Sequence, residues 1–139
     1  MGFIDVIKEK ARADKKTIVL PESMDRRTWV AAEKILKEGL ANLIIIGTPE
    51  DIGEHSEGLD VSGATIVNPQ TYEKTQEYID LFVELRKAKG MTPEKARETI
   101  LSDYAYYGCL MIKNGDADGM VSGACHSTAN TLRPCLQVI

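Results

Sequence analysis

Short apolar runs alternate with longer amphipathic segments along this chain. Four runs have the composition of buried strands, near residues 17–21, 42–47, 64–68 and 118–122. Buried strands that alternate with helices are typical of a parallel sheet joined by right-handed crossovers. The pattern therefore predicts an α/β fold with three layers, in which helices cover both faces of a parallel β-sheet.

The segments between these runs carry the spacing and the end signals of helices. Thr48-Pro49 and Thr92-Pro93 each combine a capping hydroxyl with proline at the first helical position. Asp25 is a plausible cap for the second helix, and Ser102 or Asp103 for a later one. We expect a first helix over about 3–11, a second from 26 to about 39, and a third that begins at 49. A fourth, long helix ends near 90, and a fifth begins at 93. The sixth ends near 113, and the last begins near 127.

Length and charge limit the classes of function. The chain has 139 residues, 43% of them hydrophobic and 27% charged, which suits about one globular domain. Its 17 basic and 21 acidic residues give a net charge of −4. A net negative chain argues against nucleic acid as a partner, and any anion site must be a local cluster of cations.

The cysteines and the apolar runs indicate the compartment. Cys109, Cys125 and Cys135 are odd in number and lack metal-ligand spacing, so we expect reduced thiols and no metal site. Cys125 is either a reactive thiol or a small residue in a tight loop. The longest strongly apolar run is too short to span a bilayer, and the N-terminus has no signal-type apolar core. These features predict a cytoplasmic protein with no membrane partner.

Hydroxyl, small and cationic residues are concentrated after the fourth predicted strand, in the stretch VSGACHSTANTLRP. A loop that runs from a strand into a helix start presents free backbone N–H groups, which bind anions. Ser127 and Thr128 add hydroxyl donors at that start, and Arg133 adds a forked cation that fits phosphate or carboxylate. The stretch, with Ser122 in its loop, therefore predicts an oxyanion cradle at the carboxyl edge of the sheet.

Each of these residues also has a structural interpretation. Ser127 or Thr128 is explained as a helix N-cap, and Arg133 as a surface charge. Gly123 is explained by a tight turn. For His126 we prefer the interpretation of a loop residue, because no carboxylate partner stands at motif spacing.

The segment DYAYYGCLMIKNGDADGMVSGACHSTANTLRP strongly resembles the signature region of the phosphate acetyltransferases. IVLPES followed by DRR, the LIIIG strand and ELRKAKG precede it in that family's order, so the resemblance extends through most of the chain. It implies that the chain is the first domain of a two-domain acyltransferase fold. Members of that family are about twice the length of this chain or more. Such enzymes interconvert acetyl phosphate and coenzyme A with acetyl-CoA and phosphate.

The resemblance also implies roles for particular residues. Ser127 corresponds to an active-site serine, while Arg133 and Arg86 are implicated in binding the anionic substrate or coenzyme; we add Ser122 and Thr128 to the substrate-binding set. From the residues alone, Arg86 is a solvated charge late in a helix. No metal or bound organic cofactor is implied, since coenzyme A is a substrate, and the complete protein is expected to be a homo-oligomer.

Two other functions remain open. A phosphate butyryltransferase is a close variant within the same class, and a domain of the same type is fused to malic enzymes, where it is regulatory and binds acetyl-CoA. A domain without any site is the third interpretation. Because RPCLQVI ends in an apolar helical pattern without stop signals, we expect residues 1–139 to be an incomplete N-terminal domain that is inactive alone.

Overall fold

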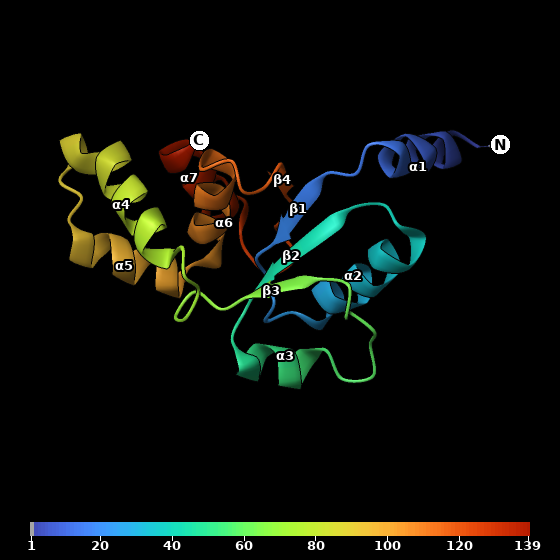
Figure 1. Ribbon diagram of the computed structural model, residues 1–139. Helices are drawn as coiled ribbons and strands as arrows, with labels where there is room; N and C mark the ends of the chain where they lie inside the picture. The colour runs from blue at the N-terminus through green and yellow to red at the C-terminus, as the bar shows by residue number, and fades with distance from the viewer. Residues whose placement is uncertain (1) are drawn as a thin grey trace.

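Four parallel strands and the helices on their two faces make up the computed structural model, which describes residues 2–139 (Figure 1). The α/β prediction is confirmed, and each predicted strand lies where the sequence placed it but ends sooner. In chain order the elements are α1 (Phe3–Ala13), β1 (Thr17–Leu20), α2 (Arg26–Glu38), β2 (Asn42–Ile46), α3 (Pro49–His55), β3 (Thr65–Val67), α4 (Thr75–Arg86), a 3-10 turn η1 (Lys87–Lys89), α5 (Pro93–Ser102), α6 (Tyr104–Lys113), β4 (Gly119–Met120) and α7 (Thr128–Val138).

The strand order is β3-β2-β1-β4, so the chain changes direction across the sheet between β1 and β4. From β1 it moves outward through β2 and β3, then returns to place β4 on the free side of β1. Ligands of open α/β sheets bind outside the carboxyl ends of the strands at such a switch point. The topology therefore predicts a binding site at the loops that follow β1 and β4.

Successive side chains of the strands point to opposite faces of the sheet, and each face contributes to its own hydrophobic core. Leu20, Leu43 and Ile45 face α2, where Trp29 and Ala32 are buried against them. The opposite sheet face packs on α4 to α7, which Figure 1 shows gathered on one side, with α2 and α3 on the other. Its largest buried members are Tyr78, Phe82, Tyr107, Ile46, Ile79, Ile100, Leu110 and Met111.

Helix α6 lies very close to the strands that lead into the switch point. A Cβ atom added at Gly108 would stand 2.7 Å from Met120 Sδ and 3.1 Å from Val19 Cγ1. Only glycine permits this approach without displacing a neighbour. The absent side chain thus lets α6 fix the positions of β1 and β4, and with them the loops that they carry.

The first helix forms as predicted, but none of its residues is buried. Phe3 is 78% exposed and Ile7 47% exposed. An ion pair between Lys8 Nζ and Glu38 Oε1, 2.7 Å apart, attaches the helix to the end of α2. The spacing of apolar residues in α1 correctly predicted a helix. That spacing indicates helical conformation, but it does not show whether the apolar face of the helix is buried.

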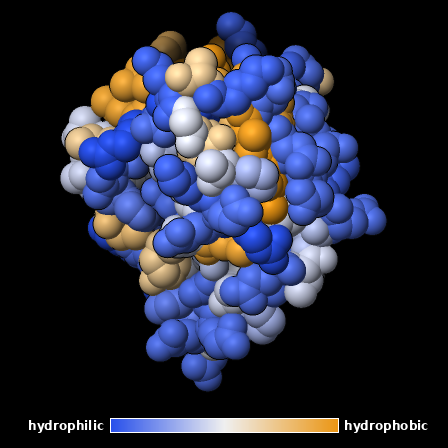
Figure 2. Space-filling view, turned by 90° about the vertical axis from the view of Figure 1, so that its left-hand side faces the viewer, coloured by the Kyte–Doolittle hydropathy of each residue, from blue (hydrophilic) through white to orange (hydrophobic). Residues whose placement is uncertain are grey.

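The surface on the α4–α5 side is mostly hydrophilic, with a few apolar strips between the charged side chains (Figure 2). Across the described residues, no helix has both the length and the apolar content needed to cross a bilayer.

Candidate active site

The loops after β1 and β4 meet at the switch point through one carboxylate. Glu22 is 2% exposed, and its Oε1 accepts N–H donors from Gly123 at 2.6 Å and Ala124 at 2.9 Å. Its Oε2 accepts the Cys125 N–H at 2.8 Å and lies 2.7 Å from His126 Nδ1. The β4 loop is therefore wrapped around a side chain from the β1 loop.

These donors decide the ionisation of Glu22. Burial favours the neutral acid, but the N–H groups of Cys125 and Ala124 and the contact with His126 outweigh it and lower the Glu22 pKa to about 2. At neutral pH the group is a buried carboxylate inside a nest of backbone N–H donors.

This arrangement corrects part of the predicted oxyanion cradle. The loop does form an anion-binding nest, but the anion is the protein's own Glu22. The prediction that the N–H groups of Gly123 to Cys125 would hold an external phosphate is wrong, because they are already paired. Of the predicted cradle, the groups not engaged by Glu22 are those at and beyond Ser127.

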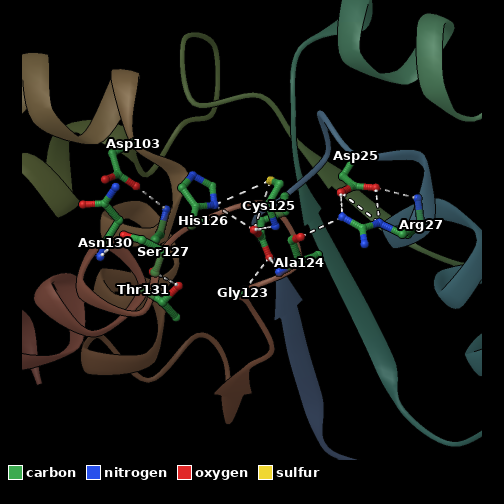
Figure 3. Close-up of polar contacts among 12 residues, drawn as sticks. Asp25, Arg27, Asp103, Gly123, Ala124, Cys125, His126, Ser127, Asn130 and Thr131 are labelled. Atoms are coloured by element: carbon green, nitrogen blue, oxygen red, sulfur yellow. Dashed lines mark hydrogen bonds and ion pairs between the residues drawn. The ribbon is translucent and has the colours of Figure 1, made fainter.

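A second contact clamps the same loop through its carbonyl. Arg27 Nη2 donates to the Ala124 carbonyl oxygen at 2.7 Å and pairs with Asp25 Oδ2 at 2.6 Å. Asp25 also caps α2 as predicted, since its side chain accepts from the Arg27 N–H. The loop is thus held by its N–H groups on one side and by a carbonyl on the other (Figure 3).

Ser127 lies at the start of α7 and is exposed. Its Oγ accepts the Asn130 N–H at 3.1 Å, which is an N-cap, and its carbonyl accepts Thr131 Oγ1–H at 2.9 Å. The cap uses an oxygen lone pair and leaves the hydroxyl proton for another acceptor. Thr128 is the first residue of α7 and is likewise exposed, so both hydroxyls stand at the positive end of the helix dipole.

The two predicted arginines act on the same tyrosine. Arg86 ends α4 and Arg133 lies in α7, which packs against α4 and α6. Burial raises the pKa of the Tyr106 phenol and Asp103 adds to the rise, whereas Arg133 and Arg86 both oppose it. The positive charges of both guanidinium groups therefore favour the ionised form of this one hydroxyl. Arg133 is exposed, and its Nη1 donates to Asn130 Oδ1 at 3.1 Å.

Ser122 occupies a different part of the site from Ser127. Its Oγ is buried and has no hydrogen-bond partner among the described residues. Together with Leu20 and Arg27 it lines a cleft of about 150 Å³ between the β1 and β4 loops. Ser127 and Arg133 are not among the residues that line this cleft, so the structure does not bring Ser122 together with them there.

Glu22 and Arg27 were not identified as site residues from the sequence, and no carboxylate partner was expected for His126. The carboxylate that His126 was expected to lack is Glu22, which stands 104 positions earlier. The one signal available was the placement of ESMDRR at the end of the first strand, the same sheet edge as the SGACH loop.

Comparison with known proteins agrees with this architecture. A family model described as phosphate acetyl/butaryl transferase matches residues 2–139. The phosphate acetyltransferase of Thermoanaerobacterium thermosaccharolyticum is 51% identical over 139 residues, which are all of this chain and 42% of that protein. A phosphotransacetylase structure from Streptococcus pyogenes superposes with a TM-score of 0.89 at 40% identity, covering 100% of this chain and 43% of the other. The EutD phosphotransacetylase from Staphylococcus aureus gives 0.86 at 37% identity, over 98% and 41%.

The fold and the match together define the class. The chain belongs to the phosphate acetyl/butaryl transferase family, and it spans about two fifths of the length of the curated relatives that it matches.

Proposed function

We propose that this chain supplies the phosphate-binding wall of a phosphate acetyltransferase, which exchanges an acetyl group between phosphate and coenzyme A. The observation that carries the proposal is the start of α7, where the exposed Ser127 caps the helix and the exposed Arg133 bonds Asn130 in the same helix. Arg86 and Arg133 both oppose the rise in the pKa of the Tyr106 phenol. In the proposal Arg133 and Arg86 supply the positive charge of a local anion site, on a chain whose net charge is −4.

The reaction makes clear demands on such a wall. The thiolate of coenzyme A attacks the carbonyl carbon of acetyl phosphate, a C–S bond forms, and the bond from carbon to the bridging oxygen breaks. Negative charge then accumulates on the departing phosphate, where paired guanidinium groups stabilise it. The Ser127 hydroxyl, whose proton the N-cap leaves free, donates to a phosphate or carbonyl oxygen, and Thr128 assists.

In this proposal coenzyme A enters as a substrate, and no resident metal or organic cofactor takes part in the acyl transfer. The complete protein would be a homo-oligomer, as the resemblance implies, and cytoplasmic, as the cysteines and the apolar pattern predict. Acetyl phosphate, inorganic phosphate and coenzyme A are its partners, and the thiol base comes from outside these residues.

A chimaera tests the proposal directly. Residues 2–139 would replace the matching segment of the T. thermosaccharolyticum enzyme, which is 51% identical there. Formation of acetyl-CoA from acetyl phosphate at a rate within tenfold of the unmodified enzyme supports the proposed role. A folded chimaera that prefers butyryl phosphate indicates the butyryltransferase alternative, and one that binds acetyl-CoA without transfer indicates the regulatory type.

A further inference from the structure

Three side chains with different donor atoms meet beside the Glu22 nest. Cys125 Sγ lies 3.1 Å from Glu22 Oε2 and 3.6 Å from His126 Nδ1, and the Nδ1–Oε2 distance is 2.7 Å. Thiol, imidazole and carboxylate are the three side-chain groups that bind Zn²⁺ in proteins. Figure 3 shows the Cys125 thiol and the His126 imidazole side by side, joined by a dashed line.

Lone-pair accounting shows that this cluster has one acceptor position for two donors. Each carboxylate oxygen offers about two lone-pair sites. Oε1 accepts the N–H groups of Gly123 and Ala124, and Oε2 accepts that of Cys125. One position on Oε2 remains, and both the Cys125 thiol and His126 Nδ1 approach it. A single cation there would replace both protons and satisfy all three groups.

We propose that Glu22 Oε2, Cys125 Sγ and His126 Nδ1 form a binding site for Zn²⁺, with water at a fourth position. This departs from the sequence-based expectation of no metal, and it lies outside the acyl-transfer chemistry proposed above. On binding, the thiol proton goes to solvent and the imidazole carries its proton on Nε2. The thiolate and the carboxylate together then balance the charge of the ion.

The distances require little rearrangement. Tetrahedral Zn²⁺ with ordinary bond lengths separates neighbouring S, N and O ligand atoms by about 3.4–3.6 Å. The Sγ–Nδ1 distance is already 3.6 Å, and the other two must lengthen from 3.1 and 2.7 Å. Because Cys125 and His126 are exposed and partly exposed, they can make this adjustment while Glu22 stays fixed.

The surroundings favour a cation at this position. Three backbone N–H donors orient Glu22, as outer-shell contacts orient metal ligands in established sites. Arg27, which donates to the Ala124 carbonyl in the same loop, has its charge paired with Asp25 at 2.6 Å. The side chain of His126 is 31% exposed, which leaves a route for the ion and for its water.

Titration of the reduced chain with Co²⁺, a spectroscopic substitute for Zn²⁺, tests the proposal. We expect one ion per chain, visible bands of tetrahedral Co²⁺, a thiolate-to-cobalt charge-transfer band, and stoichiometric displacement by Zn²⁺. In Cys125→Ser the charge-transfer band should vanish and affinity should fall at least about tenfold. His126→Gln should lower the affinity by a similar factor while the charge-transfer band persists at saturation.

The other cysteines provide matched controls. Cys109 and Cys135 lie 3.8 Å apart between α6 and α7, so each of Cys109→Ser and Cys135→Ser removes a thiol without touching the proposed ligands. Both should bind Co²⁺ like the parent chain. The proposal is overturned by an octahedral spectrum without charge transfer, by a charge-transfer band that persists in Cys125→Ser, or by one that disappears in Cys135→Ser. Absence of saturable binding overturns it as well.

Discussion

Glu22 Oε2 lies 2.7 Å from His126 Nδ1, although 104 positions separate the two residues in the chain. The contact joins the loop after β1 to the loop after β4, and three backbone N–H bonds to the same carboxylate reinforce it. Glu22 therefore acts as an internal anion that gives the β4 loop its shape and sets the position from which α7 begins.

Replacing Glu22 tests that structural role. In Glu22→Gln an N–H₂ group must face backbone donors, so we expect a loss of roughly 1–3 kcal/mol in the free energy of unfolding. Urea denaturation at pH 7 measures it. Glu57→Gln, at an exposed position, is the control and should change stability little. Equal stability of the two variants would contradict the assignment.

The same carboxylate predicts a pH dependence. Its pKa is lowered from 4.5 to about 2 in the folded chain, so its contribution to stability is complete above about pH 4.5. As the pH falls from 4.5 toward 2, up to roughly 3 kcal/mol should be lost. Urea midpoints measured across this range should fall steeply for the parent chain and less steeply for Glu22→Gln. Parallel curves would show that Glu22 is not the group responsible.

Gly108 should be intolerant of even a methyl group. The added carbon of Gly108→Ala would meet Met120 Sδ at 2.7 Å and Val19 Cγ1 at 3.1 Å, which predicts a loss of about 1–3 kcal/mol. Gly53→Ala in α3 is the matched control, since nothing lies within 4 Å of its added carbon. That variant should be more stable by up to about 1 kcal/mol. Thermal denaturation of both proteins measures the opposite signs, and a shared sign would contradict the packing argument.

In the chimaera, Arg133→Ala should impair catalysis without impairing the fold. Loss of a charge-assisted contact to the departing phosphate predicts a decrease in kcat/KM for acetyl phosphate equivalent to roughly 2–4 kcal/mol. The melting temperature should barely change, because the side chain is exposed and bonds only Asn130 among the described residues. Arg97→Ala, in the exposed part of α5, is the control for general loss of positive charge. A large fall in stability with unchanged kinetics would make Arg133 structural.

Two substitutions separate the capping role of Ser127 from its proposed role in transfer. Ser127→Ala removes the bond to the Asn130 N–H and should cost about 1 kcal/mol of stability. Ser127→Asn restores a good N-cap but not the hydroxyl donor. We therefore expect both chimaeric variants to lose activity and only the alanine variant to lose stability. Full activity in the asparagine variant would reduce Ser127 to a cap.

The chain of 139 residues should not catalyse acetyl transfer alone. Transfer between two large substrates gains up to roughly 7–11 kcal/mol from holding both in register, and a single wall open to water cannot do so. The purified chain should therefore form acetyl-CoA from acetyl phosphate at far less than a tenth of the rate of a relative. Turnover within tenfold would place the catalytic groups among these residues.

Local and non-local features differ in how well the sequence predicted them. Strand and helix positions follow from period and caps within a few residues, so β1, β2 and the starts at Thr48 and Thr92 were predicted correctly. The shortness of β4 depends on its pairing with β1 alone, which no local pattern records. The pairing of the SGACH loop with Glu22 could not be predicted from local sequence either. Neither the carboxylate nor the loop N–H groups indicate a partner, and only the strand order brings the two loops together.

The β1–β4 pairing also determines when the four-stranded sheet can finish folding during synthesis. Thr17 N–H donates to Asp118 Oδ2 across 101 positions, whereas β1 pairs with β2 about 25 positions away. Closing the longer loop costs more chain entropy and is repaid by only two register pairs. During synthesis the first three strands can assemble while one edge of β1 stays open. The segment that bears Ser127 then docks last, so a nascent chain passes through a stage in which that edge is available to chaperones or to other chains.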